Sequence, residues 1–147
     1  MSTRPSPESP RAVPSAGRLR LTVWPQRYGL ASLSKLPELA NLVTDGAPLA
    51  VVVEARESTL LAPIAVLDVV AADAVRRDDG WRALTLDGEL PLDAVGVLAS
   101  LTRALAEASV PVVVFSSFGT DHLLVPEHLL DHALAALAQV TLPGRSR

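Results

Sequence analysis

The stretch of sequence that decides the fold is VVVFSSFGTDHLLVP, residues 112–126. A β-branched run opens it, a segment rich in turn-forming residues follows, and a second apolar run ends at Pro126. Proline cannot donate a hydrogen bond to a sheet ladder and suits the first turn of a helix, so the second strand should end there. The pattern predicts a β-hairpin followed by a helix.

An earlier stretch, VVVEARESTLLAP at residues 51–63, repeats this pattern. Six residues separate its two apolar runs, against eight in the later copy. A strand candidate precedes each hairpin. The first covers residues 19–24, where apolar and polar residues alternate, and the second covers residues 81–86 and is closed by the turn signal Asp87-Gly88.

Helical periodicity follows both of these strand candidates. In the later copy Asp93 is the expected N-cap, and the apolar face is Val97, Leu98, Leu101, Leu105 and Ala108. In the earlier copy a shorter helix is expected over residues 36–43. Residues 64–77 should hold a helix and then a linker that ends at residues 78–80. A last helix is predicted from the apolar face Leu130, Ala133, Leu134, Leu137 and Val140.

The order strand, helix, hairpin therefore occurs twice. It predicts an α+β protein of two ferredoxin-like βαββ repeats, with mixed, mostly antiparallel sheets and helices on one face. The expected units are residues 18–77 and 78–142. Each has about 60 residues and is marginal alone, so we expect one cooperative body. Residues 1–17, rich in Pro, Ser and Arg, are expected to form a disordered tail, and residues 143–147 a loose one.

Composition excludes several classes of function. The net charge is −3 and no basic stripe occurs, which argues against a nucleic-acid partner. The chain has no cysteine, which excludes disulfides, thiolate metal sites and cysteine nucleophiles and is compatible with a cytoplasmic location. No apolar run approaches the length of a membrane span, so no membrane association is expected. No cofactor is expected, because phosphate- and dinucleotide-binding motifs are absent.

Two features indicate a ligand site in the later copy. Its hairpin turn, residues 115–122, is dense in hydroxyl groups and carries Asp121 and His122. The alternative explanation is ordinary turn chemistry, because the same residue types are favoured in turns. Gly96 falls in the predicted first helical turn, where free N–H groups attract anions and a missing Cβ permits close approach. Close helix–strand packing is the alternative explanation. Together, the two features match the opposite charges of an amino acid.

The motifs GVLASL at residues 96–101 and VVVFSSFGTDHLLV at residues 112–125 resemble the ACT subfamily that includes the animal cytosolic arginine sensors (CASTOR) and many small bacterial proteins. The resemblance implies a tandem ACT fold, a non-catalytic regulatory role, and an amino-acid ligand at an ACT–ACT interface; a homodimer is compatible with it. The residues that match the ligand-facing motifs are Val95, Gly96, Val97, Ser116, Ser117, Phe118, Thr120 and Asp121. The chain departs from the subfamily at Ser117, where Thr is usual, and at His122, where an aromatic residue is usual.

Other functions remain open on the sequence alone. A ligand-free interaction or dimerisation module would fit the same fold. A hydrolytic triad of Ser116, Asp121 and His122 is disfavoured, because neighbouring strand residues point to opposite faces. His128 and His132 have a spacing that can bind a metal, but no third ligand is evident.

Overall fold

The computed structural model describes residues 20–140, and the two predicted tails lie outside this range. One six-stranded sheet organises the described chain, in the order β2-β3-β1-β4-β6-β5. The strands are β1 Leu21–Leu33, β2 Ala50–Val53, β3 Ser58–Pro63, β4 Ala74–Leu86, β5 Val113–Ser116 and β6 Asp121–Pro126. The helices are α1 Ile64–Val69, α2 Val97–Glu107 and α3 Leu130–Leu137, with single 3-10 turns at η1 Leu39–Asn41, η2 Ala71–Asp73 and η3 Glu127–Leu129.

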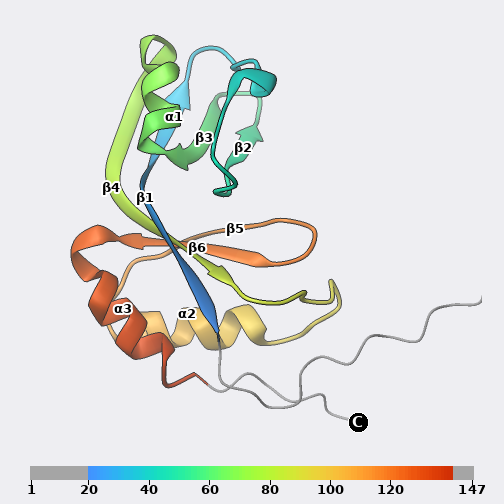
Figure 1. The fold of residues 1–147 in the computed structure, drawn as a ribbon, viewed down its shortest axis with the longest axis vertical. Helices are drawn as coiled ribbons and strands as arrows, with labels where there is room; N and C mark the ends of the chain where they lie inside the picture. The colour runs from blue at the N-terminus through green and yellow to red at the C-terminus, as the bar shows by residue number, and fades with distance from the viewer. Residues whose placement is uncertain (1–19, 141–147) are drawn as a thin grey trace, which may run out of the picture.

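Both predicted hairpins are confirmed, as β2–β3 and β5–β6. Within the described residues every strand pairing is antiparallel, so the sheet is antiparallel throughout rather than mixed. The central strands β1 and β4 are each 13 residues long and pair with one another along their length. They therefore join the half of the sheet that carries β2, β3 and α1 to the half that carries β5, β6, α2 and α3 (Figure 1).

The predicted linker that ends at residues 78–80 is largely a strand, because β4 already begins at Ala74. Four charged residues, 76–79, are accommodated there because β1 supplies a hydrogen-bonding partner strand. Ion pairs from Arg76 to Glu57 and from Arg77 to Asp68 and Asp79 add to this pairing. Pairing with β1 thus overrides the preference of this polar segment for a loop conformation.

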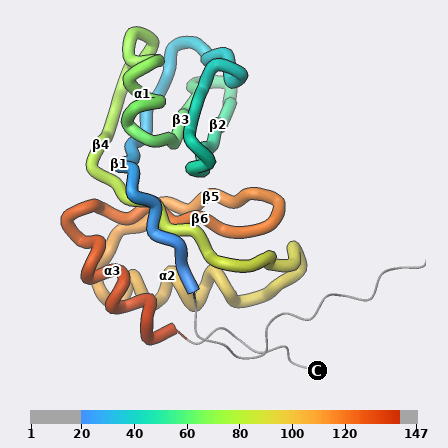
Figure 2. Tube along the Cα trace, viewed as in Figure 1, coloured from blue at the N-terminus to red at the C-terminus, as the bar shows by residue number. Residues whose placement is uncertain are grey.

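The helix predicted over residues 36–43 does not form, and only the turn η1 is present there. Pro37 disfavours a helical conformation in the preceding residue. Leu36, Leu39 and Val43 are exposed, so a helix would have no apolar partner surface. Short helices without a buried face are marginal in water, and this segment crosses the surface as a loop, as the tube in Figure 2 shows.

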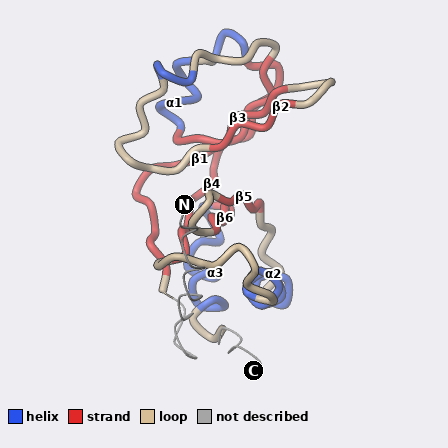
Figure 3. The backbone as a smooth tube through the Cα atoms, turned by 90° about the vertical axis from the view of Figure 1, so that its right-hand side faces the viewer, coloured by secondary structure: helices blue, strands red, loops and turns tan. Residues whose placement is uncertain are grey.

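Three apolar clusters hold the fold together. The largest buries α2 and α3 against one face of the sheet, through Leu101, Leu105 and Leu137 packed with Leu84 and Leu123. A second cluster packs α1 on β1 and β3. The third contains no helix and gathers residues from both ends of the sheet on its other face: Tyr28, Ala47, Leu61, Ala83 and Leu124. Residues of both halves of the sheet therefore pack together on this face; Figure 3 shows the two halves from the side, with α1 on the upper one and α2 and α3 on the lower one.

Gly29 marks a close approach of β1 to β4 and α1. A Cβ atom at this position would lie 2.8 Å from the Asp78 carbonyl oxygen and 2.9 Å from Leu67 Cδ1. The strand register shifts between Tyr28 and Gly29, which indicates a β-bulge here. Glycine is required at this position because backbone atoms cannot move aside.

We expect Gly29→Ala to lower the free energy of unfolding by about 1–3 kcal/mol, the usual cost of overpacking. Gly119→Ala is the matched control, because a Cβ there meets nothing within 4 Å, and its effect should stay within about 0.5 kcal/mol. Urea titration of both variants measures the difference. Equal stabilities for the two variants would contradict the close approach.

Candidate ligand-binding site

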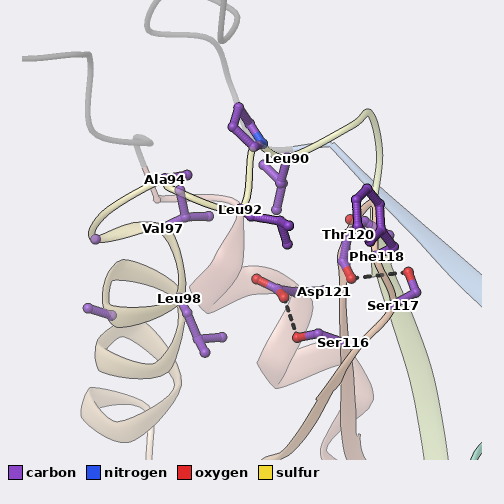
Figure 4. Close-up of a pocket in the computed structure, with 13 residues that line it drawn as sticks. Leu90, Leu92, Ala94, Val97, Leu98, Ser116, Ser117, Phe118, Thr120 and Asp121 are labelled. Carbon is purple, nitrogen blue, oxygen red and sulfur yellow. Dashed lines mark hydrogen bonds between the residues drawn. The ribbon is translucent and has the colours of Figure 1, made fainter. Parts of the chain in front are cut away.

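A cavity of about 320 Å³ lies between the start of α2 and the β5–β6 turn. Its size falls within the range of small-molecule sites. One wall is the turn and the strand ends beside it, the other is the first turn of α2, and the loop that leads from β4 to α2 closes the rim (Figure 4). The lining residues are Leu90, Pro91, Leu92, Ala94, Gly96, Val97, Leu98, Ala99, Ser116, Ser117, Phe118, Thr120 and Asp121.

The β5–β6 turn places one carboxylate and three hydroxyl groups along its wall. Ser116 and Asp121 are paired across the hairpin, and the Ser116 hydroxyl donates a 2.5 Å hydrogen bond to Asp121 Oδ1. The Thr120 hydroxyl donates to the Leu86 carbonyl oxygen at 2.8 Å, which ties the turn to the end of β4. Figure 4 shows Asp121 and Ser116 directed toward α2. A cationic group in the cavity would meet this carboxylate.

The opposite wall is the N-terminus of α2. The N-cap is Gly96, not the predicted Asp93, and the helix begins at Val97. Gly96 has φ 85°, a left-handed conformation that favours glycine, so glycine suits this position for a backbone reason besides its lack of a Cβ. No side chain caps this helix end. The N–H groups of a first helical turn have no intrahelical partner, and the helix dipole makes this end attractive to an anion.

The structure brings seven of the eight site residues predicted from the sequence to this cavity. Val95 is the exception: it does not line the cavity and is 87% exposed. Phe118 lines the rim and is 83% exposed. Sequence reasoning missed the apolar part of the wall: Leu90, Pro91, Leu92, Ala94, Leu98 and Ala99. The sequence signal for these wall residues was the apolar loop directly before the helix. Whether that loop reaches the cavity depends on how it folds back, which the sequence pattern does not encode.

His122 does not join Ser116 and Asp121 in a triad. The His122 ring lies 2.9 Å from Thr85 Oγ1 through Nδ1 and 3.3 Å from Ser117 Oγ through Nε2. Because the Thr85 hydroxyl also accepts a 2.7 Å bond from the Trp24 indole N–H, its own proton is available to Nδ1. The Ser117 hydroxyl donates its single proton to the Thr120 carbonyl oxygen at 3.3 Å, so its oxygen is left to accept from His122 Nε2–H and His122 is not placed to take a proton from it.

The other histidines are separate from the cavity. His132 Nε2 lies 3.0 Å from the Ala108 carbonyl oxygen at the end of α2, and His128 is exposed in η3. Among residues 20–140, no three His, Asp or Glu side chains gather in a way that could hold a metal ion. No helix in the same range is long and apolar enough to cross a membrane.

A second hollow, of about 330 Å³, lies in the other half of the sheet beside Ser32, Glu57, Thr59 and Arg76. Its Glu57 carboxylate is already paired, since it accepts hydrogen bonds from Ser32 and Arg76 at 2.9 and 2.5 Å. These two bonds hold the pKa of the Glu57 carboxyl below its usual range. Asp78 also lines this hollow, but no helix start does, so it lacks the anion-binding wall of the first cavity.

Residues 76–139 match the sequence model of the ACT domain. This region of the chain is therefore similar to ACT domains. The matched range begins within β4 and ends after α3, so it contains the whole cavity. The fold is the ACT ferredoxin-like fold, with α2 and α3 covering one face of an antiparallel sheet.

Solved structures extend the likeness beyond this region. A protein from Agobacterium tumefaciens is 26% identical, with a TM-score of 0.66 over 84% of this chain and 89% of that one. A protein of unknown function from Vibrio cholerae is 21% identical, with a TM-score of 0.62 over 81% of this chain and 87% of that one. The regulatory subunit of aspartate kinase from Thermus thermophilus is 13% identical, with a TM-score of 0.57 over 86% of this chain and 98% of that one. Regulatory subunits of aspartate kinase are thus among its structural neighbours.

Proposed function

We propose that this chain is a non-catalytic regulatory protein that binds an amino acid in the cavity of its ACT domain. The observation that carries the proposal is the position of Asp121 and the uncapped start of α2 on opposite walls of one cavity. An amino acid carries an ammonium and a carboxylate group close together. Asp121 suits the ammonium group or a cationic side chain, and the helix N–H groups suit the carboxylate.

The walls between these two poles also fit a small ligand. Leu92, Val97 and Leu98 provide apolar surface, and the Ser116 hydroxyl stands beside the carboxylate of Asp121. Apolar walls with a few directed polar groups are typical of small-molecule sites. The structural neighbour from Thermus thermophilus is a regulatory subunit, which is in keeping with a regulatory role here. A cytoplasmic location and the subfamily of the arginine sensors belong to the same proposal.

The other half of the sheet is, in this proposal, a divergent second ACT-like unit. Its elements β1, η1, β2, β3 and α1 follow one another in the same order as β4, α2, β5, β6 and α3. The segment that should correspond to α2 holds only the turn η1. Because η1 stands where the counterpart of α2 would be, this half of the described chain has no counterpart of the anion-binding wall, and we expect one amino-acid site per chain, in the later unit.

A thermal-shift screen of the twenty amino acids tests the proposed function. A ligand at 100 times its dissociation constant should stabilise the folded chain by about 2.7 kcal/mol. Derivatives of each active amino acid provide the control, because N-acetylation removes the ammonium charge and amidation removes the carboxylate charge. Both derivatives should stabilise less. A flat screen would instead favour a ligand-free interaction or dimerisation module, which sedimentation at several concentrations would then examine.

A further inference from the structure

His122 is the buried titratable residue directly behind the cavity. Its residue surface is 6% exposed, and its ring stacks on Phe115 with 4.9 Å between the centroids. Successive side chains of a strand point to opposite faces of the sheet. His122 therefore lies on the face opposite Asp121, although the two residues are adjacent in β6.

A directed chain of hydrogen bonds runs through this ring to the wall of the cavity. The Trp24 indole donates to Thr85 Oγ1, and the Thr85 hydroxyl donates to His122 Nδ1. His122 Nε2–H donates to Ser117 Oγ, and the Ser117 hydroxyl donates to the Thr120 carbonyl oxygen at 3.3 Å. Each hydroxyl has a single proton and the indole can only donate, so one direction satisfies every member.

This chain connects three parts of the protein. Trp24 lies in β1, Thr85 in β4, and Ser117 and Thr120 in the turn that lines the cavity. The Ser117 backbone N–H also donates to the Thr120 carbonyl oxygen, at 3.0 Å. The shape of the turn thus depends on the same oxygen that ends the chain. We propose that His122 is a positioning residue, whose neutral Nε2–H form holds the cavity-lining turn in place and, through Nδ1, ties it to Thr85 of β4.

Protonation disturbs the chain at a defined atom. A proton on Nδ1 faces the Thr85 hydroxyl, which then has to turn its own proton away. Burial lowers the pKa of His122, and the charge of Asp121 opposes this effect in part. The other groups packed around the ring are uncharged: Thr85 from β4, Phe115 from β5 and Ser117 from the turn. The neutral form is therefore expected at neutral pH; on acidification Nε2–H keeps its bond to Ser117, and the change occurs at Thr85, whose hydroxyl then accepts from Nδ1–H.

Nuclear magnetic resonance of the full chain without added ligand tests this proposal. Imidazole nitrogen spectra should show His122 protonated at Nε2, with a titration midpoint below the ordinary value of histidine. The Trp24 indole and the Ser117 and Thr120 amides should shift with that same midpoint, and the Trp81 indole should not. The three histidines and two tryptophans of the sequence make the assignment tractable by single substitutions.

Two variants separate positioning from packing. His122→Phe keeps a ring against Phe115 but removes both nitrogens, so the shared midpoint should disappear. His122→Gln can accept from Thr85 and donate to Ser117, so it should restore the neutral-pH shifts of the turn without any titration. Protonation at Nδ1, or turn amides that ignore the His122 midpoint in the unmodified protein, would overturn the proposal.

The inference relies on the proposed function only for the role of the cavity as a binding site. Its measurements use the protein without ligand, so a flat amino-acid screen would remove the proposed function and leave the behaviour of His122 to be decided separately. Conversely, a positive screen with an unresponsive turn would retain the amino-acid site and reject His122 as its positioning residue.

Discussion

A fragment of residues 78–147 is expected to fail to fold as a stable monomer. It contains most of the matched ACT domain, but it lacks β1, which pairs with β4 at ten positions from Leu21 to Leu33. It also loses Tyr28, Ala47 and Leu61 from the apolar cluster that both halves share. The cut leaves β4 as an unpaired edge strand with apolar residues exposed, a surface that favours self-association.

Circular dichroism and sedimentation measure this outcome. The control is a chain of residues 18–142, which removes both ends and keeps every element of the sheet; it should unfold in one cooperative step. The expected fragment is poorly folded or self-associating. A monomeric fragment with dispersed amide resonances would mean that the two halves are independently stable and that the shared strands contribute little.

Asp121→Asn should weaken binding of the amino acid identified by the screen by about ten- to a hundred-fold. The substitution keeps the shape and the acceptor oxygen but removes the charge, and a hydrogen bond to a charged group is worth about 1.5–3 kcal/mol. Stability should change little, because the carboxylate lies at the cavity wall, where the Ser116 hydroxyl donates to it. Isothermal titration gives the affinity and urea titration the stability.

Asp93→Asn is the matched control for charge. Asp93 is exposed in the loop before α2 and does not line the cavity, so the loss of its charge should leave the affinity within about two-fold, the scale of a screened surface charge.

Gly96→Val would block the helix end sterically, but φ 85° makes any side chain there strained, so binding and stability would fall together. Large destabilisation by Asp121→Asn with unchanged affinity would identify Asp121 as a turn residue only.

The elements with strong local signals were predictable from the sequence. The two hairpins follow from paired apolar runs that end at Pro63 and Pro126, and both form. α2 and α3 follow from apolar residues at helical spacing, because one face of each helix is buried. The cavity wall around Ser116 and Asp121 was predictable in part, because hairpin pairing places these two residues opposite one another.

Only the tertiary structure decided the remaining features. The length of β1 and β4, and hence the single sheet, depends on pairing between segments far apart in the chain, which no local pattern encodes. The same context removed the helix at residues 36–43, where Leu36, Leu39 and Val43 stay exposed. The left-handed Gly96 and the hydrogen-bond chain from Trp24 to Thr120 arise from how the loop and strands are placed in space. Sequence periodicity reports which face of an element is buried, whereas only packing determines what that face meets.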